Sequence, residues 1–131
     1  MEEIAQVTLG FPGAVETERR GNRAWNVGEK CFAWERPFTK ADIKRFAGEP
    51  VPQGEILAVR VVDLHEKEAL LAAAPKGFFT IPHFDGYAAV LVQLRVAARK
   101  PVREVLLDGW RCCAPPMGTG QNGPSPSAGR K

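Results

Sequence analysis

The stretch Arg-Ala-Trp-Asn-Val-Gly-Glu-Lys-Cys-Phe-Ala-Trp-Glu, residues 23–35, decides the fold because it predicts a β-hairpin. Gly28-Glu29 separates two runs rich in strand-forming residues, and glycine first in a two-residue loop favours a type II′ turn. Side chains along a strand alternate between its faces, so Phe32 and Trp34 are predicted to share one face. We interpret both tryptophans of the hairpin as core residues rather than as a platform that stacks on bases.

Further strands are predicted on both sides of this hairpin. Residues 55–62 form the clearest of them, because apolar residues alternate along one face. The others cover residues 15–20, which end at a Gly21-Asn22 turn, and residues 78–81 and 87–94. Because short turns and helices separate these runs, we expect an antiparallel sheet.

Four helices are predicted from their capping signals and apolar spacing. They cover residues 2–9, 39–47, 64–74 and a last segment from Pro101 to about Cys113. Thr39 and Asp63 are the expected N-caps of the second and third helices, since each has an acidic residue three positions later. In the last helix a single apolar stripe includes Trp110, which we interpret as a core anchor. The order of elements predicts an α+β fold whose antiparallel sheet has helices packed on one face.

The chain of 131 residues fits one domain, which we place at residues 1–114. Proline, glycine and serine dominate residues 115–131, and we predict a disordered tail there because it buries too little apolar surface. Apolar runs fall short of the roughly 20 residues that span a bilayer, and the acidic start Met1-Glu2-Glu3 is unlike a signal peptide. We therefore expect a cytoplasmic monomer that does not bind membranes.

Residue types that carry catalysis or hold metals are scarce. The chain has 3 cysteines and 2 histidines and no Cys-x-x-Cys pair, which is too few ligands for a structural zinc site. It also lacks a glycine-rich phosphate loop, a Gly-x-Ser-x-Gly elbow and a His-Glu-x-x-His motif. We predict no metal, no cofactor and no enzymatic activity, and we interpret the cysteines as buried or idle thiols.

The placement of basic residues matters more than their number. The net charge is +3, and Arg130 and Lys131 contribute two of these charges, so residues 1–114 are nearly neutral. A nucleic-acid surface would therefore depend on cations gathered on one face. In the helix at 39–47 we expect Ile43, Phe46 and Ala47 to be buried and the lysines and arginine to face outward. The candidate DNA contacts are Arg19, Arg20, Arg23, Lys30, Arg36, Lys40, Lys44 and Arg45.

The densest unusual stretch is Phe-Phe-Thr-Ile-Pro-His-Phe-Asp-Gly-Tyr, residues 78–87. One interpretation is a ligand pocket that contains Arg60, Thr80, His83, Asp85 and Tyr87. The alternative is a hairpin in which Asp85-Gly86 forms the turn and the aromatic residues pack inward. One histidine and one aspartate are too few for a metal site or a catalytic triad, so the turn is the stronger interpretation.

The chain resembles the MmcQ/YjbR-like proteins over residues 1 to about 115. The resemblance rests on Gly-Glu-Lys-Cys-Phe-Ala-Trp-Glu-Arg-Pro at 28–37, Leu-Ala-Val-Arg-Val at 57–61 and Lys-Glu-Ala-Leu-Leu at 67–71. It continues through the run at 78–87, which is its most specific element, and Val-Leu-Val-Gln-Leu at 90–94. The resemblance implies a CyaY-like (frataxin-like) two-layer α+β fold and DNA binding through a double-wing surface.

Three hypotheses about function follow, in decreasing order of preference. The first is a DNA-binding module in which the basic residues contact phosphates. The second is a domain that binds a small molecule or peptide in a pocket around His83, Asp85 and Tyr87. The third is an enzyme, which would require a concave pocket and a perturbed His83.

Overall fold

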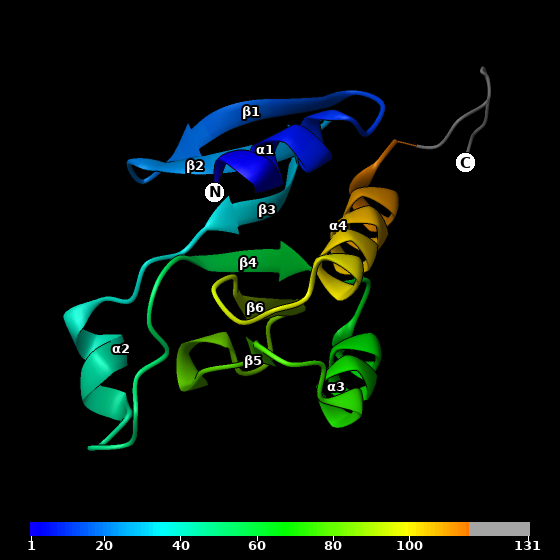
Figure 1. The fold of residues 1–131 in the computed structure, drawn as a ribbon. Helices are drawn as coiled ribbons and strands as arrows, with labels where there is room; N and C mark the ends of the chain where they lie inside the picture. Colours follow the sequence, from blue (N-terminus) through cyan, green and yellow to red (C-terminus); the bar gives the residue numbers. More distant parts are fainter. Residues whose placement is uncertain (116–131) are drawn as a thin grey trace.

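The computed structural model describes residues 1–115, which form an α+β fold built on a twisted sheet (Figure 1). The strands are β1 (Ala14–Arg19), β2 (Asn22–Val27), β3 (Lys30–Glu35), β4 (Ile56–Arg60), β5 (Phe78–Phe79) and β6 (Ala89–Gln93). The helices are α1 (Glu2–Leu9), α2 (Lys40–Arg45), α3 (Leu64–Ala73), α4 (Arg99–Cys113) and the short 3₁₀ helix η1 (Pro82–Phe84). The predicted disordered tail lies outside the described residues, except for Pro115.

The six strands form one sheet in the order β1-β2-β3-β4-β6-β5, and all neighbours are antiparallel. This confirms the predicted α+β class. Val27 pairs with Lys30, so Gly28-Glu29 is the predicted two-residue turn, and Gly28 has the positive φ of 61° that a type II′ turn requires. The predicted turn at Gly21-Asn22 is wrong by one residue, because Arg19 pairs with Asn22 and leaves Arg20-Gly21 as the loop.

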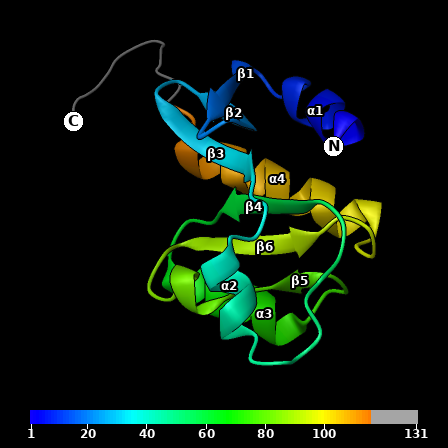
Figure 2. The same cartoon turned by 90° about the vertical axis from the view of Figure 1, so that its left-hand side faces the viewer.

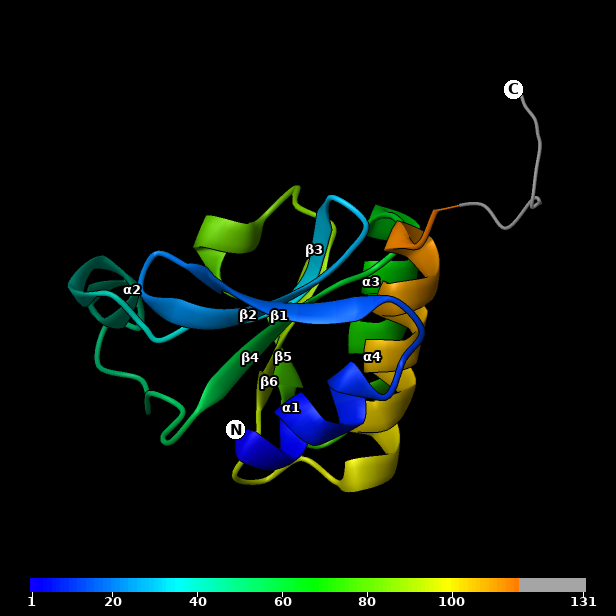
Figure 3. The ribbon, with the colours of Figure 1, turned by 90° about the horizontal axis from the view of Figure 1, so that it is seen from above.

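Three helices cover one face of the sheet. Figure 3 shows α1, α3 and α4 on the same side, and their apolar residues pack on Trp25, Leu57 and Val90. The predicted apolar stripe of α4 is confirmed at Val102, Val105, Leu106, Gly109 and Cys113, which are buried, whereas Trp110 is only half-buried against this core. Helix α4 thus lies directly against β3 and β4.

The opposite face has its own smaller core. Ala24, Trp34, Ile56, Ala58 and Leu91 are buried there. The covering residues come from β5, η1 and the segments that flank α2 and η1, and they are Phe38, Phe46, Phe79, Ile81, Phe84 and Tyr87. Figure 3 shows most of the helices on one face, as predicted, with α2 on the other side. The aromatic residues beside α2 and η1 cover part of that other face.

Phe32 and Trp34 do not share a face, so that prediction was wrong. Trp25 pairs with Ala33 and Asn26 pairs with Cys31, which leaves Phe32 as an additional residue in β3. This β-bulge turns Phe32 and Ala33 toward α4 and turns Trp34 to the opposite side. Both tryptophans of the hairpin are buried, as predicted, but they lie in different cores.

The predicted caps of α2 and α3 are confirmed. Thr39 Oγ1 accepts from the Asp42 N–H at 3.1 Å, and Asp63 Oδ1 accepts from the Glu66 N–H at 2.8 Å. The predicted apolar face of α2 is confirmed only at Phe46, which is half-buried against the second core. It is wrong at Ile43, which is 49% exposed, and at Ala47, which is also exposed, while Asp42 is buried. Asp42 is buried because it makes hydrogen bonds and an ion pair at the end of β3.

Candidate functional site

A cleft of about 450 Å³ opens beside the turn that joins β1 and β2. Its nine lining residues come from this turn, from the end of β3 and from the segment around η1. They are Arg19, Arg20, Asn22, Trp34, Glu35, Arg36, His83, Phe84 and Tyr87, and we name the site the arginine–aromatic cleft. The cleft unites three predicted DNA contacts with two residues of the predicted ligand pocket.

Three aromatic rings form the floor of this cleft. The rings of Trp34 and Phe84 are stacked with centroids 6.4 Å apart, and Tyr87 packs against them at 6.3 and 5.6 Å. Trp34 and Phe84 are only 5% and 3% exposed. Because the rings already pack on one another, they form a rigid support rather than free faces for an incoming base.

The arginines lie on this aromatic floor. The guanidinium carbon of Arg19 is 4.4 Å from the Trp34 ring centroid, and that of Arg36 is 5.6 Å from the Phe84 centroid. Such cation–π contacts hold a guanidinium in place while its N–H groups stay available. Glu35 is the carboxylate among the nine lining residues, and Asp42 pairs with Arg36 from α2, so the three arginines leave an excess of one positive charge. The cleft therefore favours an anionic ligand.

Arg36 is held by a buried carboxylate. Its Nη1 atom donates to Asp42 Oδ2 at 2.9 Å and to the Pro37 carbonyl at 2.6 Å. Burial raises the pKa of Asp42, but the Thr39 N–H and the Arg36 guanidinium outweigh it, so the pKa lies below its ordinary 3.8. Asp42 thus stays ionised at neutral pH and fixes the position of Arg36.

Arg60 supports the cleft from behind. Its Nη2 atom donates to the Tyr87 hydroxyl at 3.0 Å, and its Nε atom donates to the Cys31 carbonyl at 3.2 Å. Arg60 is therefore close to Tyr87, as the pocket hypothesis requires, but it orients the ring rather than lining the cleft. This contact fixes one wall of the site.

Lys67 of α3 is a site residue that sequence reasoning missed. It is buried, and its Nζ atom donates to the Phe84 carbonyl at 2.6 Å and to the Tyr87 carbonyl at 2.9 Å. Burial lowers the pKa of Lys67 below 10.5, and the negative charge of Asp85 partly opposes this effect. Lysine is usually a surface residue, and nothing in the neighbouring sequence indicates that Lys67 is buried. Its hydrogen bonds to residues 84–87 therefore could not be predicted from the sequence.

The other residues of the predicted pocket do not join the cleft. Asp85 lines a separate recess of about 410 Å³ beside Lys67. Thr80 is exposed and lies outside the nine lining residues, whereas His83 and Tyr87 are among them. The predicted pocket therefore forms only in part, because the 3₁₀ turn sends neighbouring side chains in different directions.

The other basic residues predicted to contact DNA lie in three places. Lys40, Lys44 and Arg45 are exposed on α2, which lies at the same end of the sheet as the β1–β2 turn; Figure 2 views the molecule from this end. Lys30 follows the β2–β3 turn at the opposite end. Arg23 is on the face of α1, where it forms ion pairs with Glu16 at 2.9 Å and with Glu2 at 3.2 Å.

Within residues 1–115, no three His, Cys, Asp or Glu side chains are grouped so that they could hold a metal ion. None of the helices in this range has the length and apolar character needed to cross a membrane.

The chain is similar to proteins from mycobacteria. It is 40% identical over 116 residues to "Uncharacterized protein Rv2570" of Mycobacterium tuberculosis (strain ATCC 25618 / H37Rv). The aligned segment covers 87% of this chain and 88% of the relative. The same values hold for "Uncharacterized protein Mb2600" of Mycobacterium bovis. No family model matches the chain, and no solved structure matches it. The chain therefore belongs to the protein family that includes these two uncharacterised mycobacterial proteins.

Proposed function

We propose that the protein binds DNA through phosphate contacts at the end of the sheet where the β1–β2 turn and α2 lie. The observation that carries this proposal is the convergence of Arg19, Arg20 and Arg36 in one cleft. Helix α2, whose Lys40, Lys44 and Arg45 are exposed, lies at the same end of the sheet (Figure 2). This is also the kind of function implied by the resemblance to the MmcQ/YjbR-like proteins with their double-wing surface.

Phosphate contact fits this surface better than contact with bases. Guanidinium groups donate paired, charge-assisted hydrogen bonds to phosphate oxygens. The rings of Trp34 and Phe84 are buried beneath Arg19 and Arg36, so they are not free to stack on bases. We therefore propose binding with little sequence preference and with a strong dependence on salt concentration.

The structure narrows the set of candidate contacts. Arg23 is engaged by two carboxylates on the α1 face, and Lys30 lies at the far end of the hairpin. The proposed contacts are therefore Arg19, Arg20, Arg36, Lys40, Lys44 and Arg45. Lys30 becomes a useful control, because it is an exposed cation beside a hairpin turn, as Arg20 is, but outside the surface.

The test is a fluorescence-anisotropy titration of labelled duplex DNA with the full chain at several salt concentrations. Each lost phosphate contact should reduce the slope of log affinity against log salt by roughly one. Arg20→Gln and Lys44→Gln should each weaken binding, while Lys30→Gln should not. The protein is also proposed to be a monomer, so sedimentation of the protein alone at the same concentrations should give the mass of one chain. An absence of binding at low salt, or an equal loss with Lys30→Gln, would refute the proposal.

A small anionic molecule or acidic peptide in the arginine–aromatic cleft is the second candidate. The specific observation is the size of the cleft, about 450 Å³, which is within the range of roughly 300–1,000 Å³ typical of small-molecule sites. Thermal-shift measurements with pyrophosphate and with a mononucleotide test it. Stabilisation that Arg36→Gln abolishes, together with no DNA binding, would favour this function over the first.

A further inference from the structure

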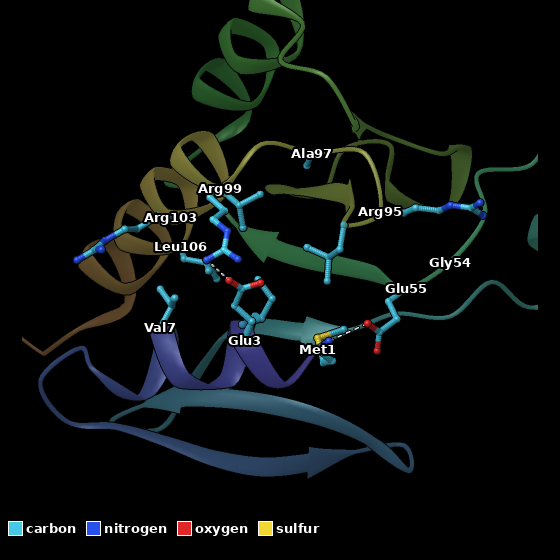
Figure 4. Close-up of a pocket in the computed structure, with 13 residues that line it drawn as sticks. Met1, Glu3, Val7, Gly54, Glu55, Arg95, Ala97, Arg99, Arg103 and Leu106 are labelled. Carbon is cyan, nitrogen blue, oxygen red and sulfur yellow. Dashed lines mark hydrogen bonds and ion pairs between the residues drawn. The ribbon is translucent and has the colours of Figure 1, made fainter.

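A second pocket, of about 500 Å³, lies between α1, the first half of α4 and the adjoining end of the sheet (Figure 4). None of its lining residues is shared with the arginine–aromatic cleft as both are defined within residues 1–115. We name it the helix pocket. A ligand in the helix pocket would therefore contact none of the residues that line the arginine–aromatic cleft.

The floor of the helix pocket is apolar. Ile4 and Val7 come from α1, Val102 and Leu106 from α4, and Leu94 from the loop after β6. Figure 4 shows Val7 pointing from α1 toward Leu106. Water in contact with such a floor is released when an apolar group covers it, which favours the binding of an apolar chain.

The rim of the helix pocket is cationic. Arg95, Arg99, Arg103 and the Met1 amino group line it, against the carboxylates of Glu3 and Glu55. Figure 4 shows the Arg95 and Arg103 side chains extending outward from the pocket on opposite sides, whereas Arg99 reaches across to Glu3.

The two carboxylates of the rim already have partners. The Met1 amino group pairs with Glu55 at 2.7 Å, and Arg99 pairs with Glu3. Among residues 1–115, Arg95 and Arg103 have no carboxylate partner. The rim therefore keeps positive charge that an anionic group can neutralise.

The Glu3–Arg99 pair indicates which anion suits the rim. In this pair a carboxylate from α1 reaches across to a guanidinium of α4 beside the apolar floor (Figure 4). Both side chains are largely exposed, and such a pair contributes little to stability, so an incoming carboxylate can take the place of Glu3. Arg99 would then bind the ligand in the geometry that it already uses for Glu3.

We propose that the helix pocket binds a small amphipathic carboxylate of the fatty-acid class. Its apolar chain covers the floor between α1 and α4, and its carboxylate replaces Glu3 at Arg99. The rim holds four positive groups against two carboxylates, so it favours a negatively charged acid over the corresponding neutral alcohol.

The decisive experiment uses the two partners of one ion pair. Glu3→Gln and Arg99→Gln break the same contact, so a purely structural effect would be similar in both variants. If the ligand carboxylate competes with Glu3, Glu3→Gln should tighten binding and Arg99→Gln should weaken it, each by roughly tenfold. Lys30→Gln, far from the pocket, is the matched control and should leave binding unchanged.

Binding is measured by calorimetry with decanoate and with decanol, on the full chain carrying any purification tag at its C-terminus. Circular dichroism confirms that each variant is folded. The proposal predicts that decanoate binds at least several-fold more tightly than decanol. It is overturned if decanol binds equally well, if both variants shift the affinity in the same direction, or if folded protein binds no decanoate. None of these results affects the proposed DNA surface.

Discussion

The Nη1 atom of Arg36 lies 2.9 Å from Oδ2 of Asp42, and this ion pair joins the wall of the arginine–aromatic cleft to α2. The same carboxylate oxygen accepts from the Thr39 N–H at 2.9 Å. The side chains of Arg36 and Asp42 are 16% and 2% exposed. The Asp42 carboxylate therefore caps α2 and also fixes the position of Arg36, a proposed phosphate contact. The start of α2 and the position of Arg36 thus depend on a single residue.

Asp42→Ala should reduce the free energy of unfolding by about 2 kcal/mol or more, because it removes a helix cap and leaves the Arg36 guanidinium unpaired. Thr39→Ala removes only one capping hydrogen bond and should cost about 1 kcal/mol. Urea unfolding measures both. A loss in Asp42→Ala no larger than that in Thr39→Ala would show that the ion pair contributes nothing.

The stability difference between the wild type and Asp42→Ala should depend on pH. The pKa of Asp42 in the folded state lies below its ordinary value of 3.8, so the ionised carboxylate stabilises the fold above pH 3.8. This contribution is lost as the pH falls through the lower pKa of the folded state. Urea unfolding of both proteins between neutral and acidic pH should show the difference closing; a constant difference would contradict the assignment.

Lys67→Met should loosen the segment that carries His83 and Tyr87. The substitution removes the lysine hydrogen bonds to the Phe84 and Tyr87 carbonyls, each of which keeps one backbone N–H donor, and should cost about 1–3 kcal/mol. Hydrogen exchange should accelerate across residues 84–87 more than in the sheet. Glu68→Met changes an exposed neighbour on the same helix and serves as control. Equal exchange rates in both variants would rule out this role for Lys67.

Gly109→Ala should destabilise the protein even though alanine is the better helix former. A Cβ atom at this position would lie 2.8 Å from the Arg60 carbonyl oxygen and 3.0 Å from Val59 Cγ1, so α4 must move away from β4. We expect a net loss of about 1–3 kcal/mol on thermal or urea unfolding. Asp108→Ala, at an exposed position of the same helix, should change stability by less than about 0.5 kcal/mol.

The three cysteines should differ in reactivity. Burial, together with the neighbouring Cys112, raises the pKa of Cys113 to about 11, so almost no thiolate exists there at neutral pH. Cys31 and Cys112 are partly exposed. Mass spectrometry after brief iodoacetamide treatment of native protein should find Cys113 the least modified. Preferential alkylation of Cys113 would show that α4 opens readily.

Parts of the fold that depend on local signals could be predicted from the sequence. The Gly28-Glu29 turn, the caps at Thr39 and Asp63 and the apolar stripe of α4 are all decided by residues within a few positions of one another. The bulge at Phe32 could not be predicted in this way. The bulge depends on how β3 packs between β2 and α4. The alternation of residue types along β3 alone does not indicate this packing.

The candidate site was predicted only in pieces for the same reason. Arg19 and His83 were assigned to different hypotheses, yet they line one cleft because the sheet brings together segments that are distant in sequence. Asp42 and Lys67 were missed because their burial depends on partners outside their own helices. Charged residues that are buried by tertiary contacts leave no periodic pattern in the sequence.

The bulge at Phe32 also determines where this family can tolerate a change in length. Cys31 and Trp34 keep their partners on β2 whether or not the additional residue is present. In a relative that lacked one residue here, every other side chain of the hairpin would still point to the same face of the sheet. That relative would lose only one side chain that packs under α4. Loss of a residue elsewhere in β3 would instead invert the side chains that follow it. Gaps in alignments of these proteins should therefore fall at this point of the strand.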